Sequence, residues 1–452
     1  MSNVSENTII SCAMSEKIDG KLNILVLHRL GDPKQSRHFL RNHVFCLKNY
    51  APQHNYIYHD VHLKFPSYLK DVRFHGIIFD VTFLCLRWFA DRYINRMWEE
   101  YSFLKDVDAV KIALPQDEYD HNRVLDEWLT KFNTDIVYTV CPEHWDILYP
   151  NYSKTGQIKL GYTGYLDDGD VYRKNLKPFQ DRRIDVGYRA RNLPYYFGRI
   201  GEIKSKIGGL FLKSSKGENF ICDISNLPED AILGEKWLDF IGDSKFTLGS
   251  NSGSSLLDPY GEIGKCVRNY CESYPSASFE EVESACFPGL DGQYEFTALS
   301  PRLIEAATMK SCQVLVKGSY SHVVKSWEDY IPLESDFSNK QEVFEAMRDH
   351  SYVKQLIDSC FNKIANNPAL RYREHVNNLL HDIVNGVERK SLVATDDQKI
   401  RKMIDKHSNY IENESRKRWK ILRRQKLLSG AIEKVSPRLH SKLLKIYRAV
   451  MN

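Results

Sequence analysis

The stretch Ser300–Val316, SPRLIEAATMKSCQVLV, decides the fold that the sequence predicts. Ser300 is a residue type favoured at a helix N-cap, and Pro301 suits the first helical position, which needs no N–H donor. The helix is predicted to run to about Lys310 and to be followed by a short buried strand, Cys312–Val316. A strand, a helix that starts at Ser-Pro and a second strand form one βαβ unit, so the stretch predicts an α/β fold.

Apolar strands and helices alternate through the rest of the chain, which predicts two open parallel sheets. Strands of the first sheet are expected at 22–28, 56–59, 76–79, 109–114, 135–140 and 158–162. Strands of the second are expected at 184–188, 220–224, 245–248 and 312–316. Helices are predicted at 32–50, 84–104, 121–132, 198–208 and 279–286, with two more in 341–387.

Composition is that of an ordinary globular protein, with 42% hydrophobic and 27% charged residues. The ten cysteines are scattered without C-x-x-C or Cys/His zinc spacing, so we expect reduced thiols and a cytoplasmic location. The N-terminus lacks a basic region followed by an apolar stretch, so no signal peptide is expected.

Positive charge is concentrated near the C-terminus. Residues 398–452 hold 16 Lys and Arg against 4 Asp and Glu, whereas the whole chain has a net charge of +4. Trp419 and several leucines lie among these basic residues. The pattern fits docking on an anionic membrane surface, binding of nucleic acid or of an acidic helix, or a helix that packs on the core by its leucines.

Two charged residues stand on the helix that follows Ser300. Arg302 and Glu305 are three apart, so they share one side of the helix near its positively polarised end. That end favours an anionic group, and Arg302 adds a forked set of donors, while Glu305 can accept hydrogen bonds from sugar hydroxyls. Ser300, Arg302 and Glu305 are candidate donor-binding residues; the alternative is an exposed ion pair on an ordinary helix.

Two adjacent carboxylates, Asp117 and Glu118, follow the strand predicted at 109–114. Because α/β folds place ligands at the carboxyl ends of their strands, both are candidate catalytic groups. A carboxylate can deprotonate an acceptor hydroxyl or act as a nucleophile that holds a sugar. The alternative is a turn whose acids cap the next helix. His28, at the end of the first strand, is a second candidate base, although a histidine without a catalytic role is the commoner outcome.

Arg189 and Arg191 follow the strand predicted at 184–188 and suit a diphosphate or a sugar carboxylate. Lys204, on the next predicted helix, adds a third positive charge. The alternative for these side chains is surface solubility.

The Ser/Gly loop 249–255 contains Ser252, Gly253 and Ser254, whose N–H groups and hydroxyls are candidate donors to an anion. The loop lacks the Gly-Lys-Ser/Thr ending of a P-loop and the G-x-G-x-x-G pattern of dinucleotide oxidoreductases. A plain turn is the alternative.

The segment Ser300–Asn339 resembles the C-terminal, donor-binding half of bacterial GT-B glycosyltransferases and is similar to their CgeB-like, surface-polysaccharide group. That group shares a Ser-Pro-Arg-x-x-Glu-Ala helix, a strand, a Gly-x-Tyr turn, a Tyr-Ile-Pro-Leu strand and Asp-Phe-Ser-Asn, in the order found here. The resemblance covers roughly Arg183 to Asn339. It implies that Tyr320, in the Gly-x-Tyr turn, lies near the donor, and it supports a role for the segment Pro-Gln-Asp-Glu-Tyr that contains Asp117 and Glu118.

The resemblance implies a GT-B architecture, in which two Rossmann-like domains face a cleft. The implied activity is transfer of a sugar from a nucleotide-sugar donor to a glycan or lipid-linked acceptor in bacterial surface polysaccharide biosynthesis. The expected divisions are a flexible N-terminus at 1–20, an acceptor-side domain at 21–166, a linker at 167–182, a donor-binding domain at 183–345, helices that cross back at 346–396 and a basic helical tail at 397–452.

We expect no cofactor and no metal, because helix N-termini and arginines would neutralise the leaving phosphate. The expected partners are the nucleotide sugar and the acceptor, with an anionic membrane surface as a candidate partner of residues 397–452 and no nucleic acid. The protein would then lie in the cytoplasm or on the inner face of the cytoplasmic membrane. The alternatives are a nucleotide-sugar epimerase or hydrolase on the same fold, and a non-enzymatic protein that uses its basic tail on a membrane or on nucleic acid.

Overall fold

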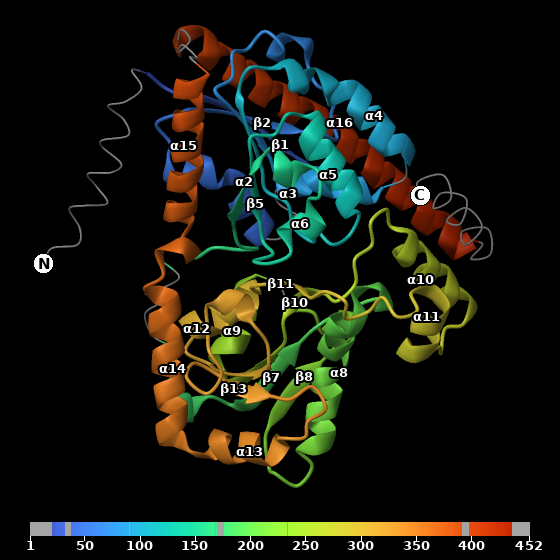
Figure 1. Cartoon of the computed structure of the whole chain (residues 1–452), viewed down its shortest axis with the longest axis vertical. Coiled ribbons are helices and arrows are strands. Elements are labelled where there is room, and N and C mark those ends of the chain that lie inside the picture. Colours follow the sequence, from blue (N-terminus) through green and yellow to red (C-terminus); the bar gives the residue numbers. More distant parts are fainter. Residues whose placement is uncertain are drawn as a thin grey trace, which may run out of the picture. The chain divides into compact units, whose positions relative to one another are not determined.

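The computed structural model describes residues 20–31, 38–89, 91–167, 169, 176–232, 234–390 and 397–435 (Figure 1). These residues belong to two compact units. The first unit lies within Met1–Pro115, Trp128–Val137 and Val376–Asn452, and the second within Gln116–Glu127 and Tyr138–His375. Residues 1–19, predicted to be flexible, 168 and 170–175 of the predicted linker, and 436–452 of the predicted basic tail lie outside the described part.

The first sheet has the strand order β2-β1-β3-β4-β5-β6. Its strands are β1 (Asn23–His28), β2 (Asn55–Asp60), β3 (Gly76–Phe79), β4 (Val110–Ala113), β5 (Ile136–Thr139) and β6 (Gln157–Leu160). The pairings of β1 with β2 and β3, and of β4 with β3 and β5, are parallel. β1, β3, β4 and β5 are buried along their whole length, as expected for parallel strands covered on both faces.

The helices of the first unit are mostly amphipathic. They include α2 (His38–Tyr50), α3 (Val81–Leu84), α4 (Asp91–Tyr101) and α16 (Asp397–Val435), while α5 (Asn122–Lys131) and α15 (Tyr372–Arg389) have residues in both units. The prediction of a single helix at 84–104 is wrong. Asp80 caps α3 by accepting from the Thr82 N–H at 2.8 Å, and Phe89 is extended, so the segment forms several short helical pieces.

The second sheet has the order β13-β12-β9-β7-β8, and each of its neighbouring pairs is parallel. Its strands are β7 (Ile184–Arg189), β8 (Cys222–Ser225), β9 (Ser244–Gly249), β12 (Cys312–Val316) and β13 (Ile331–Leu333). Val186, Phe246, Val314 and Ile331 lie in one buried core with Phe211. The predicted α/β class, with two Rossmann-like parallel sheets and a C-terminal helical extension, is confirmed.

Helices cover this sheet and connect its strands. They are α8 (Gly198–Ser214), α9 (Glu235–Gly242), α12 (Pro301–Thr308), α13 (Lys340–Arg348) and α14 (His350–Ala365). Two further helices, α10 (Glu262–Ser273) and α11 (Phe279–Cys286), pack on each other in a separate cluster, and the short α6 (Trp145–Leu148) lies elsewhere in the unit. The region 341–387 holds three helices rather than the two predicted. Asp349 ends α13 and caps α14 by accepting from the Tyr352 N–H at 3.0 Å.

Two features of the second unit differ from the sequence-based expectation. Cys266 and Cys286 form a disulfide that joins α10 to α11, so the expectation of reduced thiols does not hold at these two positions. Ser252–Ser254 forms a strand, β10, which pairs antiparallel with β11 (Phe296–Ala298) instead of forming an open loop. Among the described residues, no helix combines the length and the apolarity needed to cross a lipid bilayer.

Candidate functional site

A pocket lies at the switch point of the second sheet. The chain passes from β7 to β8 on one side and then to β9 on the other, and α/β folds bind ligands where the strand order reverses in this way. The ends of β7 and β9, the first turn of α12 and side chains of α8 and α9 line the pocket. Its lining includes Gly187, Arg189, Lys204, Trp237, Phe240, Thr247, Gly249, Ser250, Ser300, Arg302 and Tyr320.

The N-terminus of α12 points its polarised end at this pocket. Ser300 occupies the N-cap without a side-chain capping bond, and Pro301 follows as the first helical residue. Arg302, in the first turn, lies with its guanidinium 5.2 Å from the centre of the Trp237 ring and donates to the carbonyl oxygen of Arg189. The helix end and Arg302 therefore place positive potential where the sequence predicted an anionic group.

Lys204 adds a second positive charge, from α8. Its Nζ lies 3.4 Å from Oγ of Ser252. Burial lowers the pKa of Lys204 to about 8, repulsion by Arg302 lowers it as well, and attraction by Asp117 opposes both effects. Arg302 and Asp117 are thus close enough to Lys204 to change its pKa. The predicted catalytic carboxylate of Asp117 therefore lies within electrostatic range of a residue that lines the pocket.

The ionisation of Lys204 leads to a pH prediction. Lys204 should lose its proton as the pH rises through about 8, so affinity for a nucleoside diphosphate should fall between pH 7.5 and 9. The phosphate charge is nearly constant in this range because its last ionisation lies near pH 6. Calorimetric titration at several pH values measures the effect, and Lys204→Arg, which stays charged, should remove the pH dependence. An unchanged pH dependence in Lys204→Arg would rule Lys204 out as its source.

The same shift has a consequence for stability. The folded state holds Lys204 with a pKa below its ordinary value, so the unfolded chain binds more protons between pH 8 and 10.5. This group therefore destabilises the fold at lower pH, and its contribution improves as the pH rises through that window. A lysine whose pKa is lowered by burial in a pocket marks a candidate functional site.

Two buried hydroxyls in the pocket lack a hydrogen-bond partner within the described part of the chain. They are Oγ1 of Thr247 and Oγ of Ser250, in residues that are 9% and 8% exposed. Burying a hydroxyl without a partner costs about 1–3 kcal/mol. A polar ligand in the pocket would recover this cost.

Comparisons with known proteins identify no family. No family model and no curated protein matches this chain. Among solved structures, sucrose-phosphate synthase from Thermosynechococcus elongatus aligns with a TM-score of 0.47 and 10% identity over 82% of this chain and 100% of its own. A glycosyltransferase from Rickettsia africae aligns with a TM-score of 0.46 and 10% identity over 82% and 99%.

HepE from Anabaena, solved in complex with UDP and glucose, aligns with a TM-score of 0.43 and 10% identity over 81% of this chain and 100% of its own. At TM-scores below 0.5, these similarities carry no conclusion about this chain.

Asp117 belongs to a tight turn that is part of the second unit. Its backbone has φ +50°, a conformation that is costly for a residue other than glycine and is often found at functional sites. The carboxylate is exposed and accepts a hydrogen bond of 2.6 Å from the Tyr119 hydroxyl. Tyr119 is buried against Phe197 and Phe296, so it fixes the turn to the body of the unit. Asp117 therefore remains the best-placed catalytic candidate.

Glu118 does not face solvent. Its side chain is fully buried, and Oε1 accepts from the Thr139 hydroxyl at 2.7 Å, the Val140 N–H at 2.9 Å and the Tyr149 hydroxyl at 3.3 Å. A carboxylate held in this way cannot reach an acceptor. This corrects the prediction that Glu118 is a catalytic residue. Its buried carboxylate fixes the turn to the end of β5.

His28 is also unsuited to act as a base. It is buried at the end of β1, and its Nδ1 accepts the N–H of Leu30 at 3.2 Å. The neutral ring then carries its proton on Nε2 and has no free nitrogen to accept another. Burial lowers the pKa of His28, against the attraction of Asp60 and Asp80. The structure therefore gives His28 a structural role and corrects the sequence-based prediction.

Within the predicted anion-binding loop 249–255, Gly253 and Ser254 have structural roles. Ser254 is buried, and its hydroxyl bonds to the backbone of Leu256, accepting from the N–H at 2.9 Å and donating to the carbonyl oxygen at 3.0 Å. Gly253 has φ +124°, and a Cβ there would lie 1.9 Å from the carbonyl oxygen of Phe296. Gly253 thus allows β10 and β11 to approach each other closely. Gly249 and Ser250 of the loop line the pocket, and the Ser252 hydroxyl lies 3.4 Å from Nζ of Lys204.

Arg189 and Tyr320 line the pocket, but their polar groups have protein partners. The Arg189 guanidinium donates to Oδ1 of Asp223 at 2.6 Å and to the Asp223 carbonyl at 2.8 Å, because Asp223 lies on the neighbouring strand β8. The Tyr320 hydroxyl donates to the carbonyl oxygen of Val316, and the ring is buried. Both residues shape the pocket wall. Arg191 is exposed and is not part of the pocket lining.

Glu305 is linked to the pocket through an aromatic residue that the sequence analysis did not single out. Nε1 of Trp237 donates to Oε2 of Glu305 at 2.7 Å, and Trp237 also stacks on Phe240. Ser250, from the predicted loop 249–255, lines the pocket, whereas Trp237, Thr247 and Gln313 line it and were missed. Their only sequence signal was a polar residue inside an otherwise apolar strand, as in Thr247 of β9 and Gln313 of β12.

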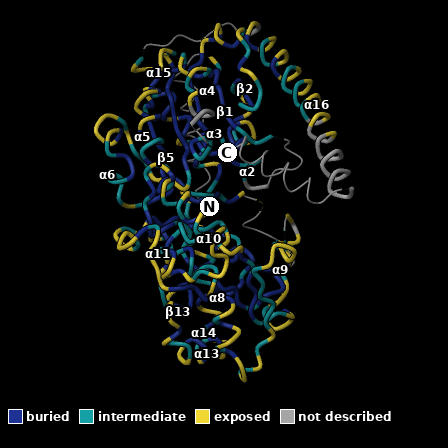
Figure 2. Tube along the Cα trace, turned by 90° about the vertical axis from the view of Figure 1, so that its right-hand side faces the viewer, coloured by how far each residue is buried: buried dark blue, intermediate teal, exposed yellow. Residues whose placement is uncertain are grey.

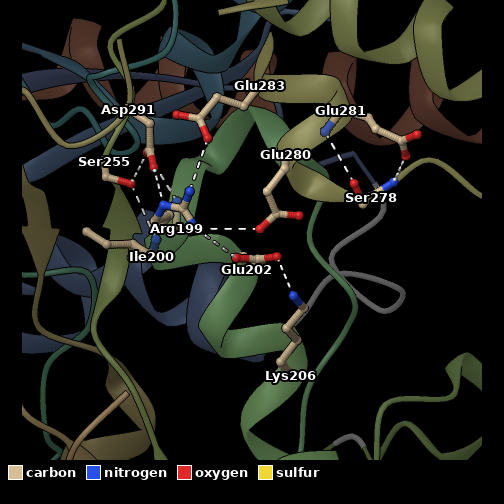
Figure 3. A network of polar contacts seen from close by, with 10 residues as sticks. All are labelled: Arg199, Ile200, Glu202, Lys206, Ser255, Ser278, Glu280, Glu281, Glu283 and Asp291. Atoms are coloured by element: carbon tan, nitrogen blue, oxygen red, sulfur yellow. Dashed lines mark hydrogen bonds and ion pairs between the residues drawn. The ribbon is translucent and has the colours of Figure 1, made fainter. Parts of the chain in front are cut away.

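A network around Arg199 fixes the helix that carries Lys204 (Figure 3). Arg199, in the first turn of α8, lies 3.1 Å from Glu283 of α11 and 3.4 Å from Asp291. Asp291 also accepts from the Ser255 hydroxyl at 2.7 Å, and Ser255 accepts from the Ile200 N–H at 3.3 Å. Protein groups therefore satisfy the N-terminus of α8. This helix positions Lys204 but does not bind the anion with its own end.

Proposed function

We propose that this protein is a glycosyltransferase that binds a nucleotide-sugar donor in the pocket of the second unit. The observation that supports this best is the convergence of Lys204, Arg302 and the start of α12 on one pocket, with Asp117 in electrostatic range of Lys204. A site of this kind fits a ligand with an anionic centre and a reacting carbon beside it. The acceptor would be a glycan or a lipid-linked glycan of bacterial surface polysaccharide biosynthesis, as the sequence resemblance implies.

The pocket offers a separate environment to each part of a nucleotide. Lys204, Ser252, Arg302 and the α12 N-terminus would bind the diphosphate through charge-assisted hydrogen bonds. The Oγ atoms of Thr247 and Ser250, which have no partner within the described part, would bond to polar atoms deeper in the pocket. Glu305, oriented by Trp237, would accept from ribose hydroxyls.

In the proposed reaction, an acceptor hydroxyl forms a bond to the anomeric carbon while the bond from that carbon to the phosphate oxygen breaks. The leaving nucleoside diphosphate gains negative charge, which Lys204 and Arg302 stabilise. Asp117 takes the proton of the acceptor if the anomeric configuration is inverted. If the configuration is retained, Asp117 is the nucleophile of a two-step route. The two cationic side chains would make a metal ion unnecessary, and no cofactor is needed.

Variants of Arg302, in the pocket, and of Arg191, outside it, test the donor site. Thermal-shift and calorimetric screens with nucleoside diphosphates and CMP should find one nucleotide that binds. Arg302→Met should weaken its binding by about 10–100-fold, the loss of one charge-assisted hydrogen bond of about 1.5–3 kcal/mol. Arg191→Met removes the same charge outside the pocket and should leave binding unchanged. No binding by any nucleotide, or equal losses in both variants, would contradict the proposed donor site.

A nucleotide-sugar hydrolase or epimerase would use the same pocket, since the residues that hold the diphosphate would be identical. Release of nucleoside diphosphate or a change in the sugar without any acceptor would identify this alternative. Because a nucleotide sugar is the proposed substrate, we place the protein in the cytoplasm or at the inner face of the cytoplasmic membrane.

A further inference from the structure

Helix α16 is attached to the first unit over part of its length. His407 is buried, the Tyr410 hydroxyl donates to the carbonyl oxygen of Lys64 at 2.9 Å, and Arg418 donates to the carbonyl oxygen of His62 at 3.2 Å. These contacts hold α16 against the loop 61–64 that follows β2. This loop lies at the carboxyl edge of the first sheet, where Asp60 and His62 form a 2.8 Å pair.

The same part of the helix has an unusual density of positive charge. Residues 416–424, which we call the basic stretch, contain six Lys and Arg and no Asp or Glu. Lys417, Lys420 and Arg424 are three and four residues apart, so they share one side of the helix, and all three are exposed. Figure 2 shows the described part of α16 with mainly exposed and intermediate residues.

Within the described residues, this side of the helix is only partly neutralised by its own chain. Lys417 lies 2.6 Å from Glu414, and Arg416 pairs with Glu412 one turn earlier. A hollow beside the helix is lined by Tyr410, Asn413, Glu414, Arg416, Lys417 and Lys420. A phosphate group fits this hollow, since Asn413, Arg416, Lys417 and Lys420 can each donate a hydrogen bond to an anion.

An exposed aliphatic residue distinguishes between anionic partners. Ile421 is 56% exposed and lies four residues after Lys417, on the same side of the helix. An isoleucine in the middle of a basic surface gains nothing from a phosphodiester backbone. At a membrane surface it would enter the boundary between headgroups and acyl chains while the basic residues contact the headgroups.

We propose that the basic stretch of α16 binds an anionic phospholipid surface. Through the bonds of Tyr410 and Arg418 to the loop 61–64, this docking would hold the carboxyl edge of the first sheet beside the membrane. The proposal goes beyond the donor site and is independent of it, because it requires neither nucleotide binding nor sugar transfer. It does, however, give a lipid-linked acceptor a route to the protein.

Vesicle binding by the full chain tests this proposal. Sedimentation with vesicles of phosphatidylcholine that contain about 30% phosphatidylglycerol should show binding that decreases with salt, whereas pure phosphatidylcholine vesicles should bind weakly. The variant Lys417→Gln, Lys420→Gln, Arg424→Gln should bind at least about 30-fold more weakly, since each basic residue near such a surface contributes about fivefold. Its control, Lys216→Gln, Lys399→Gln, Lys402→Gln, removes the same charge from other exposed positions and should bind as the parent does.

Ile421→Ser separates lipid from nucleic acid. It should weaken vesicle binding several-fold through lost apolar burial and leave binding to a single-stranded DNA oligonucleotide unaltered. Equal vesicle binding by the two triple variants, no preference for anionic vesicles, or tighter salt-dependent binding to DNA than to vesicles would each overturn the proposal. Melting curves of all variants confirm that the chain is folded in every measurement.

Discussion

Asparagine in place of Asp117 is expected to lower kcat by about 10²–10⁴-fold, the range that a positioned acid–base group contributes. The donor should still bind, with a Kd within about twofold of the parent. The asparagine side chain would keep an oxygen that accepts the Tyr119 hydroxyl, so the turn would retain its contact. It could neither take a proton nor attack the anomeric carbon.

The loss is measured as release of nucleoside diphosphate in the presence of acceptor, using the nucleotide sugar whose nucleotide the screen identifies. Glu118→Gln is the matched control from the adjacent position. It should lower the free energy of unfolding by about 1–3 kcal/mol, because the hydrogen bonds from Thr139, Val140 and Tyr149 would lose their charged acceptor. Full activity in Asp117→Asn, or a large loss of its melting temperature, would remove Asp117 from the proposed mechanism.

Alanine in place of Gly253 is expected to destabilise the second unit by about 2–4 kcal/mol. The backbone has φ +124°, and the added Cβ would lie 1.9 Å from the carbonyl oxygen of Phe296. Because that oxygen belongs to the backbone of β11, the clash cannot be relieved by a side-chain rotation, and β10 must separate from β11. Ser252 would move with β10, so nucleotide binding should weaken through the lost contact with Lys204.

Gly209→Ala provides the control. Gly209 lies within α8, and a Cβ there would meet nothing within 4 Å. Alanine should stabilise the helix by up to about 1 kcal/mol relative to glycine. Both variants are compared in urea unfolding followed by tryptophan fluorescence. A Gly253→Ala protein as stable as Gly209→Ala would show that the strands at β10 and β11 are not paired as described.

The strands of both sheets were predicted closely, because most of them are short apolar runs between polar connections. The strand Cys312–Val316 has the bounds predicted, and β3 coincides with the predicted 76–79. The start of α12 at Pro301 follows from local capping chemistry. Helices α9 and α10 and the strands β10 and β11 were missed; each of these strands is only three residues long and is stabilised by a partner distant in the chain.

Charged residues in the proposed site were predicted in part. Arg302, Lys204 and Asp117 were chosen for their chemistry, and the fold brings them within electrostatic range of one another. Glu118, the next residue after the exposed Asp117, differs from it in direction: its carboxylate points inward to Thr139 and Val140. No sequence pattern distinguishes the two, because the distinction depends on a strand more than 20 residues away.

From its sequence alone, this chain could be assigned two parallel sheets, a helix start that favours anions and a separate basic segment. These properties arise from neighbouring residues, whose capping, periodicity and charge act over a few positions. Which acids are exposed, which arginine already has a partner and which hydroxyls lack one depended on contacts across the fold. Burial and hydrogen-bond satisfaction are properties of residues far apart in the chain, so only the folded structure could settle them.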